Sequence, residues 1–225
     1  MPISDDLRRQ AAPIWDAQLA HPFVRGIGDG TLAIETFGLW LRQDYLFLID
    51  YGRILGYAAA RAPDLATMRG FAAAMHETLH AEMELHRSYV AEFGITAADL
   101  EREAMLPTTR AYVDFLLRTA ATADYAEVVA AILPCMWGYS ELGRALAGQG
   151  LPPDERYARW INTYADDAFA TLAQWCRGVL DAVADGLPPH AQRRIEAAFI
   201  TSSRYELAFW EMAWRGERWL PIGDG

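Results

Sequence analysis

The sequence has few cysteines and a shortage of positive charge. Its 225 residues include two cysteines, Cys135 and Cys176, and carry 30 acidic against 20 basic side chains, for a formal net charge of −10. Two cysteines supply neither a disulfide framework nor the ligand spacing of a zinc site. The acidic excess argues against binding to phosphate backbones, because such binding depends on clustered basic side chains. We therefore expect two free thiols and no nucleic-acid partner.

Long apolar runs are missing as well. The longest, residues 128–137, is too short to cross a bilayer, and the first residues lack the apolar core of a secretory signal. We expect no membrane partner and a cytoplasmic location. Because 52% of the residues are hydrophobic, the chain can bury one sizeable core, and we expect a single domain over residues 1–225.

Alternating, strand-like runs are also absent, and apolar residues recur at helical spacing almost everywhere. This pattern predicts an all-α, multi-helix bundle with its functional site between facing helices. The breaker-rich residues 21–30 are predicted to form a loop, and Asp124 with Glu127 is predicted to cap a helix. The predicted helices cover residues 5–19, 34–61, 65–93 (closed by Gly94), 108–121, 124–148, 154–186 with a break near 166–167, and 190–215.

One proline lies well inside a predicted helix. Pro134 removes an amide donor, so we expect a kink there, and Cys135 follows at once. Tyr139 lies one turn later on the same helix face, where its hydroxyl can address the thiol. These residues are a candidate nucleophile and its hydrogen-bond partner. Cysteine is also among the most buried residue types, and this stretch alone favours a small structural side chain.

Two carboxylates are embedded among aromatic residues. Asp44, Phe47 and Tyr51 share a helix face in an apolar segment, which suits a flat ligand that carries an amine. An ordinary surface aspartate is equally consistent with that spacing. Glu206 also lies among aromatic residues, and its alternatives are a salt bridge to Arg204 or a solvated face.

A third polar segment matches a metal motif. The five residues from His76 to His80 read HETLH, the HExxH pattern of zinc proteases. Because Glu82 and His86 follow on the same helix, the segment could equally hold a di-iron carboxylate site. A zinc protease also needs a third ligand and a framing strand, which the sequence does not offer. We therefore expect a polar helix face, no metal and no cofactor.

Four segments together resemble the TenA family in order and spacing. They begin at His21 (HPFVRGIGDGTL), Gln43 (QDY), Leu133 (LPCMWGY) and Tyr205 (YELAFW), and EMELH from Glu82 lies between them. The resemblance covers nearly the whole chain. It implies a heme-oxygenase-like helical fold and a homotetramer.

The resemblance also implies roles for individual residues. Cys135 would be the nucleophile that adds to a pyrimidine ring, and Tyr139 would hydrogen-bond its sulfur. Glu206 would hold and protonate a ring nitrogen, while Asp44 would contact the amino side of the ring and assist proton transfer. The residues that would stack against or border the ring are Phe47, Tyr112 and Tyr164.

The implied activity is that of thiaminase II, in thiamin salvage or degradation. Such a hydrolase converts 4-amino-5-aminomethyl-2-methylpyrimidine, and thiamin, to 4-amino-5-hydroxymethyl-2-methylpyrimidine. Phe47 stands where other members carry tyrosine, so the expected pocket wall lacks one hydroxyl. Two alternatives remain: a heme-oxygenase-like, metal-dependent oxidase, and a non-enzymatic regulatory protein, which the acidic charge disfavours. The oxidase would use His76, His80, Glu82 and His86.

Overall fold

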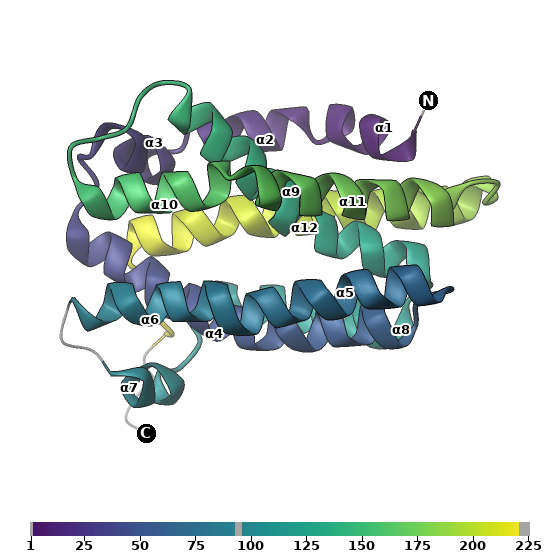
Figure 1. Cartoon of the computed structure of the whole chain (residues 1–225), viewed down its shortest axis with the longest axis horizontal. Coiled ribbons are helices and arrows are strands. Elements are labelled where there is room, and N and C mark those ends of the chain that lie inside the picture. The colour runs from purple at the N-terminus through teal and green to yellow at the C-terminus, as the bar shows by residue number, and fades with distance from the viewer. Residues whose placement is uncertain (1, 93–95, 221–225) are drawn as a thin grey trace.

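The computed structural model describes residues 2–92 and 96–220, and within these ranges the chain forms helices and no strand (Figure 1). The prediction of an all-α fold is confirmed. In chain order the elements are α1 (Ile3–Gln10), α2 (Ala12–Leu19), α3 (Pro22–Asp29), α4 (Ile34–Ala60), α5 (Leu65–Glu77), the π-helical turn η1 (Thr78–Glu82), α6 (Met83–Ala91), α7 (Ala97–Arg102), α8 (Pro107–Thr122), α9 (Tyr125–Ala147), α10 (Glu155–Ala165), α11 (Asp167–Ala184) and α12 (Pro189–Arg215).

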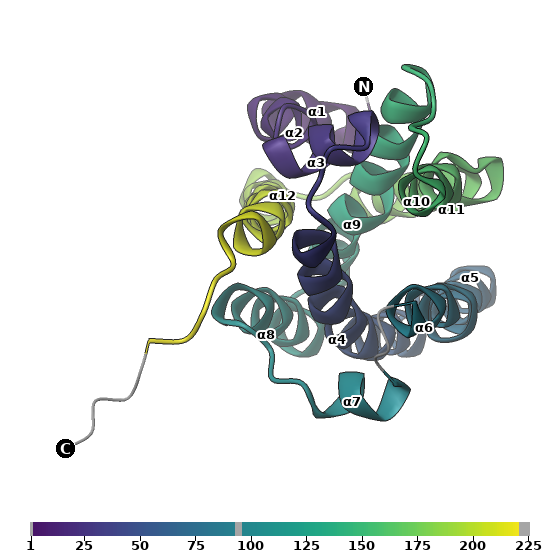
Figure 2. The ribbon, with the colours of Figure 1, turned by 90° about the vertical axis from the view of Figure 1, so that its left-hand side faces the viewer.

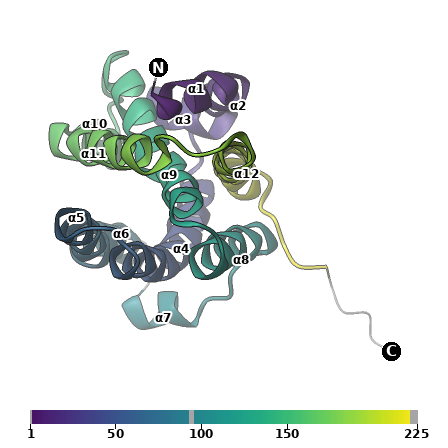
Figure 3. The same ribbon diagram turned by 90° about the vertical axis from the view of Figure 1, so that its right-hand side faces the viewer.

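Helices α9 and α4 form the middle of the bundle. Helix α9 packs against α10, α11 and α12, and α4 packs against α5, α6 and α8 (Figures 2 and 3). Every side chain from Val128 to Pro134 in α9 is buried, because a helix that is apolar on all sides is stable only when neighbours surround it. The longest apolar run of the sequence is thus the central helix. Among the described residues, no helix is long and apolar enough to cross a membrane.

The predicted loop over residues 21–30 is wrong, because α3 occupies most of it. The proline at the start of α3 fits a position where the amide has no helical partner. The His21 ring accepts a hydrogen bond from the amide of Phe23 (3.2 Å), and the Phe23 side chain is fully buried. Gly30, with φ of 76°, then ends the helix in the left-handed conformation. Capping and burial therefore outweigh the glycines that suggested a loop.

Other helix boundaries agree with the prediction except at two places. The predicted first helix is divided at Ala11, because α2 begins beside Pro13, which has no amide hydrogen to continue the ladder. The predicted helix over 65–93 is interrupted by η1, which inserts a wider turn between α5 and α6. Its predicted end at Gly94 lies outside the described residues. The break near 166–167 is confirmed, since Asp166 separates α10 from α11.

The two carboxylates that were predicted to cap the start of α9 make other contacts. Asp124 occupies the N-cap position, but its side chain makes no capping hydrogen bond. Both Asp124 and Glu127 instead bind the guanidinium of Arg194 on α12, and Glu127 accepts from Nε at 2.8 Å. The two carboxylates therefore join α9 to α12.

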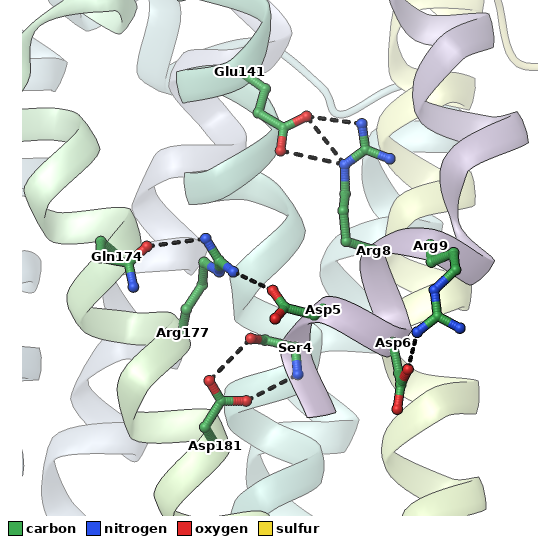
Figure 4. A network of polar contacts seen from close by, with 9 residues as sticks. All are labelled: Ser4, Asp5, Asp6, Arg8, Arg9, Glu141, Gln174, Arg177 and Asp181. Carbon is green, nitrogen blue, oxygen red and sulfur yellow. Dashed lines mark hydrogen bonds and ion pairs between the residues drawn. The ribbon is translucent and has the colours of Figure 1, made fainter. Parts of the chain in front are cut away.

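A network of polar contacts fastens α1 to α9 and α11 (Figure 4). The Arg8 guanidinium contacts the Glu141 carboxylate at 2.9 Å, and Arg177 contacts Asp5 at 2.7 Å. Asp181 accepts hydrogen bonds from the amide and the hydroxyl of Ser4, at 2.9 and 3.0 Å. We call these contacts the α1 network.

Candidate active site

A cavity of about 510 Å³ lies between α4, the α5–η1–α6 segment, α9, α10 and α11. Of the residues that the structure describes, three carboxylates, one thiol and three phenols belong to its lining, and no arginine, lysine or histidine does. Most of the remaining wall is apolar. A cavity with few polar groups among apolar walls is typical of a small-molecule site. The polar and aromatic lining residues are Asp44, Tyr51, Glu77, Thr78, Glu82, Cys135, Tyr139, Thr163, Tyr164 and Phe169.

Cys135 borders this cavity from α9, which continues as a helix through Pro134. In the turn before the proline, the Ile132 carbonyl accepts a hydrogen bond from the Tyr51 hydroxyl (3.2 Å). The same hydroxyl lies close enough to the Cys135 thiol to lower its pKa. Tyr51 of α4 therefore links the helix turn before the thiol to the surroundings of the sulfur.

Tyr139 also borders the cavity, one turn beyond the thiol. Among the described residues its hydroxyl has no hydrogen-bond partner, and the phenol that lowers the pKa of the Cys135 thiol is Tyr51. The Tyr139 ring packs against Tyr164 (5.0 Å between centroids) and Trp210 (5.2 Å). These contacts hold its hydroxyl at the cavity wall, free for a ligand. Its expected role at the sulfur stays a prediction.

The Cys135 thiol is strongly biased towards its neutral form. Burial raises its pKa well above the ordinary value, and the nearby charges of Glu206, Glu82 and Asp44 raise it further. The nearby Tyr51 hydroxyl acts in the opposite direction but does not reverse the shift of the pKa. The thiolate can therefore form only as the proton is passed to another group. Cys176 is fully buried away from the cavity, and burial raises its pKa to about 12.

Glu206 lies on α12, beside the thiol. Its carboxylate accepts a hydrogen bond from the Tyr112 hydroxyl at 2.6 Å, and that hydroxyl contacts the Ser202 hydroxyl at 2.8 Å. Ser202 in turn donates to the carbonyl of Ala131 (2.7 Å), one turn before Cys135. This chain of contacts ties the acid to the turn that carries the nucleophile. The alternative of a solvated face is wrong, because the side chain is 3% exposed.

Burial raises the pKa of Glu206 to about 8. The hydrogen bond from Tyr112 lowers the pKa, while the charge of Asp44 raises it. Because the groups that shift its pKa include no cation within the part of the chain that the structure describes, the neutral form is favoured near neutral pH. Glu206 is thus available as a proton donor in the range where enzymes operate.

Asp44 is buried and paired, not a surface aspartate. Its Oδ2 lies 2.7 Å from Nε2 of His86, and Nδ1 of His86 lies 2.8 Å from the Glu82 carbonyl oxygen. Burial acts to lower the pKa of His86, but the hydrogen bond and charge of Asp44, together with Glu82, raise it above the usual value. The buried Asp44 carboxylate therefore favours the charged form of the His86 ring. The second oxygen of Asp44 has no hydrogen bond among the described residues and faces the cavity side.

Glu82 completes the acidic wall at the end of η1. The Tyr164 hydroxyl donates a hydrogen bond to its Oε1 at 3.0 Å. Burial raises the pKa of Glu82 to about 7, and the charge of Asp44 adds to the shift, while His86 and Tyr164 act against it. Glu82 thus titrates near neutral pH.

Phe47 and Tyr112 lie behind this wall. The Phe47 ring stacks on Tyr51 (5.5 Å between centroids) and on Tyr112 (5.1 Å). Neither Phe47 nor Tyr112 belongs to the cavity lining, whereas Tyr164 does. The structure therefore brings Asp44, Cys135, Tyr139 and Tyr164 together at the cavity. Glu206, Tyr112 and Phe47 adjoin this lining, and the carboxyl group of Glu206 lies close enough to the Cys135 thiol for its charge to raise the pKa of the thiol.

Comparison with known proteins agrees with this geometry. The sequence profile described as the TENA/THI-4/PQQC family matches residues 8–216. The chain belongs to this family. An aminopyrimidine aminohydrolase from Halalkalibacterium halodurans is 41% identical over 97% of this chain and 98% of its own length. A second aminopyrimidine aminohydrolase, from Bacillus subtilis, is 34% identical over 97% and 92%.

Solved structures support the same assignment. A TenA homologue from P. horikoshii OT3 superposes with a TM-score of 0.88 at 30% identity, over 96% of this chain and all of that one. A domain of unknown function with a heme oxygenase-like fold, from Shewanella denitrificans, superposes with a TM-score of 0.64 at 15% identity, over 94% and 92%. The predicted heme-oxygenase-like fold of this TENA/THI-4/PQQC chain is therefore confirmed.

The four residues of the metal alternative do not converge. His76 and His80 stack on each other, 4.3 Å between ring centroids, on an exposed face. His86 uses both ring nitrogens on Asp44 and on a backbone carbonyl. Within residues 2–92 and 96–220, no three acidic, cysteine or histidine side chains gather as a metal-binding group. The HETLH segment is thus a helix face that continues into η1.

Sequence reasoning missed three contributors to the site. The sequence places Tyr51 only by its spacing from Asp44, and it offers Glu82 and His86 as candidate metal ligands and as part of the EMELH segment, without a role in the proposed chemistry. The available signal was the four-residue spacing of Glu82 and His86, which places them on one helix face. Their partners on α4 and α10 follow from tertiary packing that a single sequence does not display.

Proposed function

We propose that this protein is a hydrolase that acts on aminopyrimidines, in thiamin salvage or degradation. Its substrates are 4-amino-5-aminomethyl-2-methylpyrimidine and thiamin, and its product is 4-amino-5-hydroxymethyl-2-methylpyrimidine. The aminopyrimidine aminohydrolases that match it at 41% and 34% identity over nearly their full lengths support this function.

The observation that carries the proposal is the acidic cavity around Cys135. A thiol borders it, Glu206 with a pKa of about 8 lies beside the thiol, and no basic side chain is part of its lining. Such a site favours a flat, basic ligand whose ring nitrogens can receive protons. An aminopyrimidine has this chemistry, whereas a phosphorylated ligand would be repelled.

The first half of the reaction activates the ring. The Cys135 sulfur forms a bond to a ring carbon as its proton passes to Asp44, and Glu206 gives its proton to a ring nitrogen. These steps disrupt the aromatic system, so that ring electrons can form an exocyclic double bond to the methylene carbon. The carbon–nitrogen bond of the protonated aminomethyl group (–CH2–NH3+) then breaks, and neutral ammonia leaves with the bonding pair.

The second half restores the ring. Water adds its oxygen to the methylene carbon, and its proton passes to the departed ammonia, which becomes ammonium. The ring nitrogen returns its proton to Glu206, the carbon–sulfur bond breaks, and the sulfur recovers its proton from Asp44. Covalent catalysis thus divides one difficult displacement into two easier steps. Tyr51 and Tyr139 hold the sulfur side of the site during both halves.

The deciding experiment is direct. Purified protein is incubated with aminomethylpyrimidine and, separately, with thiamin, and hydroxymethylpyrimidine is sought by mass spectrometry. We expect the product from at least the aminomethyl substrate. Failure to form it from either compound would reject the proposed activity.

We also propose that the protein acts in the cytoplasm as a homotetramer. The TenA resemblance supports the tetramer, and exposed apolar side chains on α4 and α5 are compatible with subunit contacts. Tyr57, Leu65 and Met68 are 44%, 58% and 40% exposed. Analytical ultracentrifugation tests this assembly, and a monomer at micromolar concentration would reject it.

A further inference from the structure

Only one of the two carboxylate oxygens of Glu82 accepts a hydrogen bond within the described residues. Oε1 accepts the hydrogen bond from Tyr164 at 3.0 Å, and Oε2 has no partner among the described residues. Glu82 lines the cavity together with Thr78, Ala81 and Leu85 of the same helical segment. It is thus an oriented acceptor at the cavity wall, outside the set of residues to which the proposed reaction gives a role.

The other two acids near the thiol are already engaged. Asp44 pairs with the imidazole of His86 at 2.7 Å, so its charge is compensated. Glu206 accepts from Tyr112 at 2.6 Å and does not belong to the cavity lining. Glu82 accepts from a phenol and forms no ion pair within the described residues, and the one positive charge that lowers its pKa, on His86, is already paired with Asp44. A cationic ligand would therefore gain more from Glu82 than from either of the other acids.

The position of Glu82 is built into the backbone. It is the last residue of η1, and π-helical turns are frequent at functional sites because their extra residue redirects side chains. Helix α9 approaches α10 so closely that a Cβ atom added to Gly143 of α9 would lie 2.5 Å from the backbone of Tyr164 on α10. This glycine allows Tyr164 to lie where its hydroxyl reaches Glu82.

We propose that Glu82 binds the protonated amine of the aminomethyl group, and so selects an amine over a thiazolium as the leaving group. The inference rests on the proposed function, whose substrates differ only in that group. An ammonium carries N–H donors for Oε2, whereas the thiazolium nitrogen of thiamin carries none. Tyr164 orients the carboxylate through its hydrogen bond to Oε1.

The test compares both substrates in the parent protein and in Glu82→Gln. The amide keeps the size of the neutral acid and the acceptor for Tyr164, but it loses the charge. A hydrogen bond to a charged group is worth a factor of about 10 to 100 in affinity, so KM for aminomethylpyrimidine should rise by about that factor. The kcat should not fall, because the positive charge on the amine is lost as the carbon–nitrogen bond breaks, so the contact with Glu82 is weaker in the transition state than in the ground state. KM for thiamin should change less than about threefold, because the thiazolium nitrogen carries no N–H that could donate a hydrogen bond to Oε2.

Glu84→Gln is the matched control. Glu84 lies two residues further along, is 71% exposed and pairs with Arg87 on the surface. The same chemical change there should leave both substrates at parental values. This separates a local contact from a general loss of negative charge.

A binding measurement makes the result independent of turnover. In a Cys135→Ala background, calorimetry compares the aminomethyl substrate with the hydroxymethyl product, with and without Glu82→Gln. The proposal expects weaker binding of the amine alone. Equal losses for both ligands, or no loss for either, would overturn it. If the parent lacked turnover, the proposed function would fail, but an amine-specific loss of binding would still establish the role of Glu82.

Discussion

Helix α9 contributes to two polar clusters that differ in the proportion of acidic to basic side chains. In the α1 network, Glu141 of α9 faces Arg8, and Asp5 faces Arg177 (Figure 4). At the cavity, on the same helix, the thiol is near three acids whose hydrogen-bond donors are two phenols and one histidine. The first cluster pairs Glu141 and Asp5 with arginines at the surface, and its other acid, Asp181, accepts from Ser4. The second keeps acids buried with few cations.

The difference shows which cluster serves the fold and which serves chemistry. Partly exposed ion pairs gain little net free energy, because water already solvates both charges well. Acids buried without cations have raised pKa values, so their neutral forms persist near neutral pH, at a cost to folding stability at higher pH. Only the second arrangement provides proton donors in the range where an enzyme works. Mutations in the α1 network should therefore change stability alone, whereas mutations at the cavity should change catalysis.

The largest expected effect is at the thiol. Cys135→Ala and Cys135→Ser should lower kcat by about a thousandfold or more, because neither side chain supplies a comparable nucleophile near neutral pH. The circular dichroism spectrum should be unchanged. Steady-state kinetics with aminomethylpyrimidine measures the loss, and near-parental activity of Cys135→Ala would contradict covalent catalysis.

The other cysteine is the control for this prediction. Cys176 is fully buried in α11, and its thiol stays neutral because burial raises its pKa to about 12. Cys176→Ala should keep parental kcat. It should lower thermal stability modestly, through the small cavity that the change leaves.

The next effect concerns proton transfer. Glu206→Gln keeps the shape and an acceptor for Tyr112 but cannot give a proton to the ring nitrogen. We expect kcat to fall by about 100-fold to 10,000-fold, the usual contribution of general acid–base catalysis. The affinity for hydroxymethylpyrimidine, measured by calorimetry, should change far less. Normal turnover of this variant would remove Glu206 from the mechanism.

Helical periodicity was sufficient to predict part of this site. The four-residue spacing of Cys135 and Tyr139 places both on one face of α9, and both border the cavity. The site residues that it missed depend on contacts between distant segments. The Asp44–His86 pair joins residues 42 positions apart, and that contact exists only because α4 packs against α6.

Two local features of the backbone also could not be predicted from the sequence. A π-helical turn changes the register of the side chains that follow it, and nothing in the residues of η1 marks the extra residue in advance. In α3, the glycines suggested a loop, but burial of Phe23 and the cap from His21 stabilise a helix. In both cases tertiary packing decided between conformations that are close in local propensity.

A smaller effect should appear in the pH dependence of stability. In the folded protein Glu206 has a pKa of about 8 and Glu82 of about 7, against 4.5 as the ordinary value. Between these limits the folded state holds more protons than the unfolded chain, so the free energy of unfolding falls as pH rises. For Glu206 this loss is on the order of 3 to 5 kcal/mol between about pH 5 and about pH 9.

Glu206→Gln removes that titration and sharpens the test. The variant should be more stable than the parent at about pH 9, and the two should be nearly equal at about pH 5. Urea denaturation at both pH values measures the difference. A parent protein whose stability rises from pH 5 to pH 9 would contradict the assignment of a neutral Glu206 in the folded state.

The smallest effect is expected in the α1 network. Glu141→Gln removes the charge that faces Arg8, where the two side chains are 39% and 26% exposed. Such a pair is worth about 0.2 to 1 kcal/mol, so the Tm should fall by no more than about 4 °C, and kcat should be unchanged. At about 1 M salt, where the Debye length is near 3 Å, the difference should shrink further. Thermal melts at low and high salt measure it. A Tm loss above about 10 °C, or a fall in kcat, would show that the two clusters on α9 are coupled and would remove the division between them.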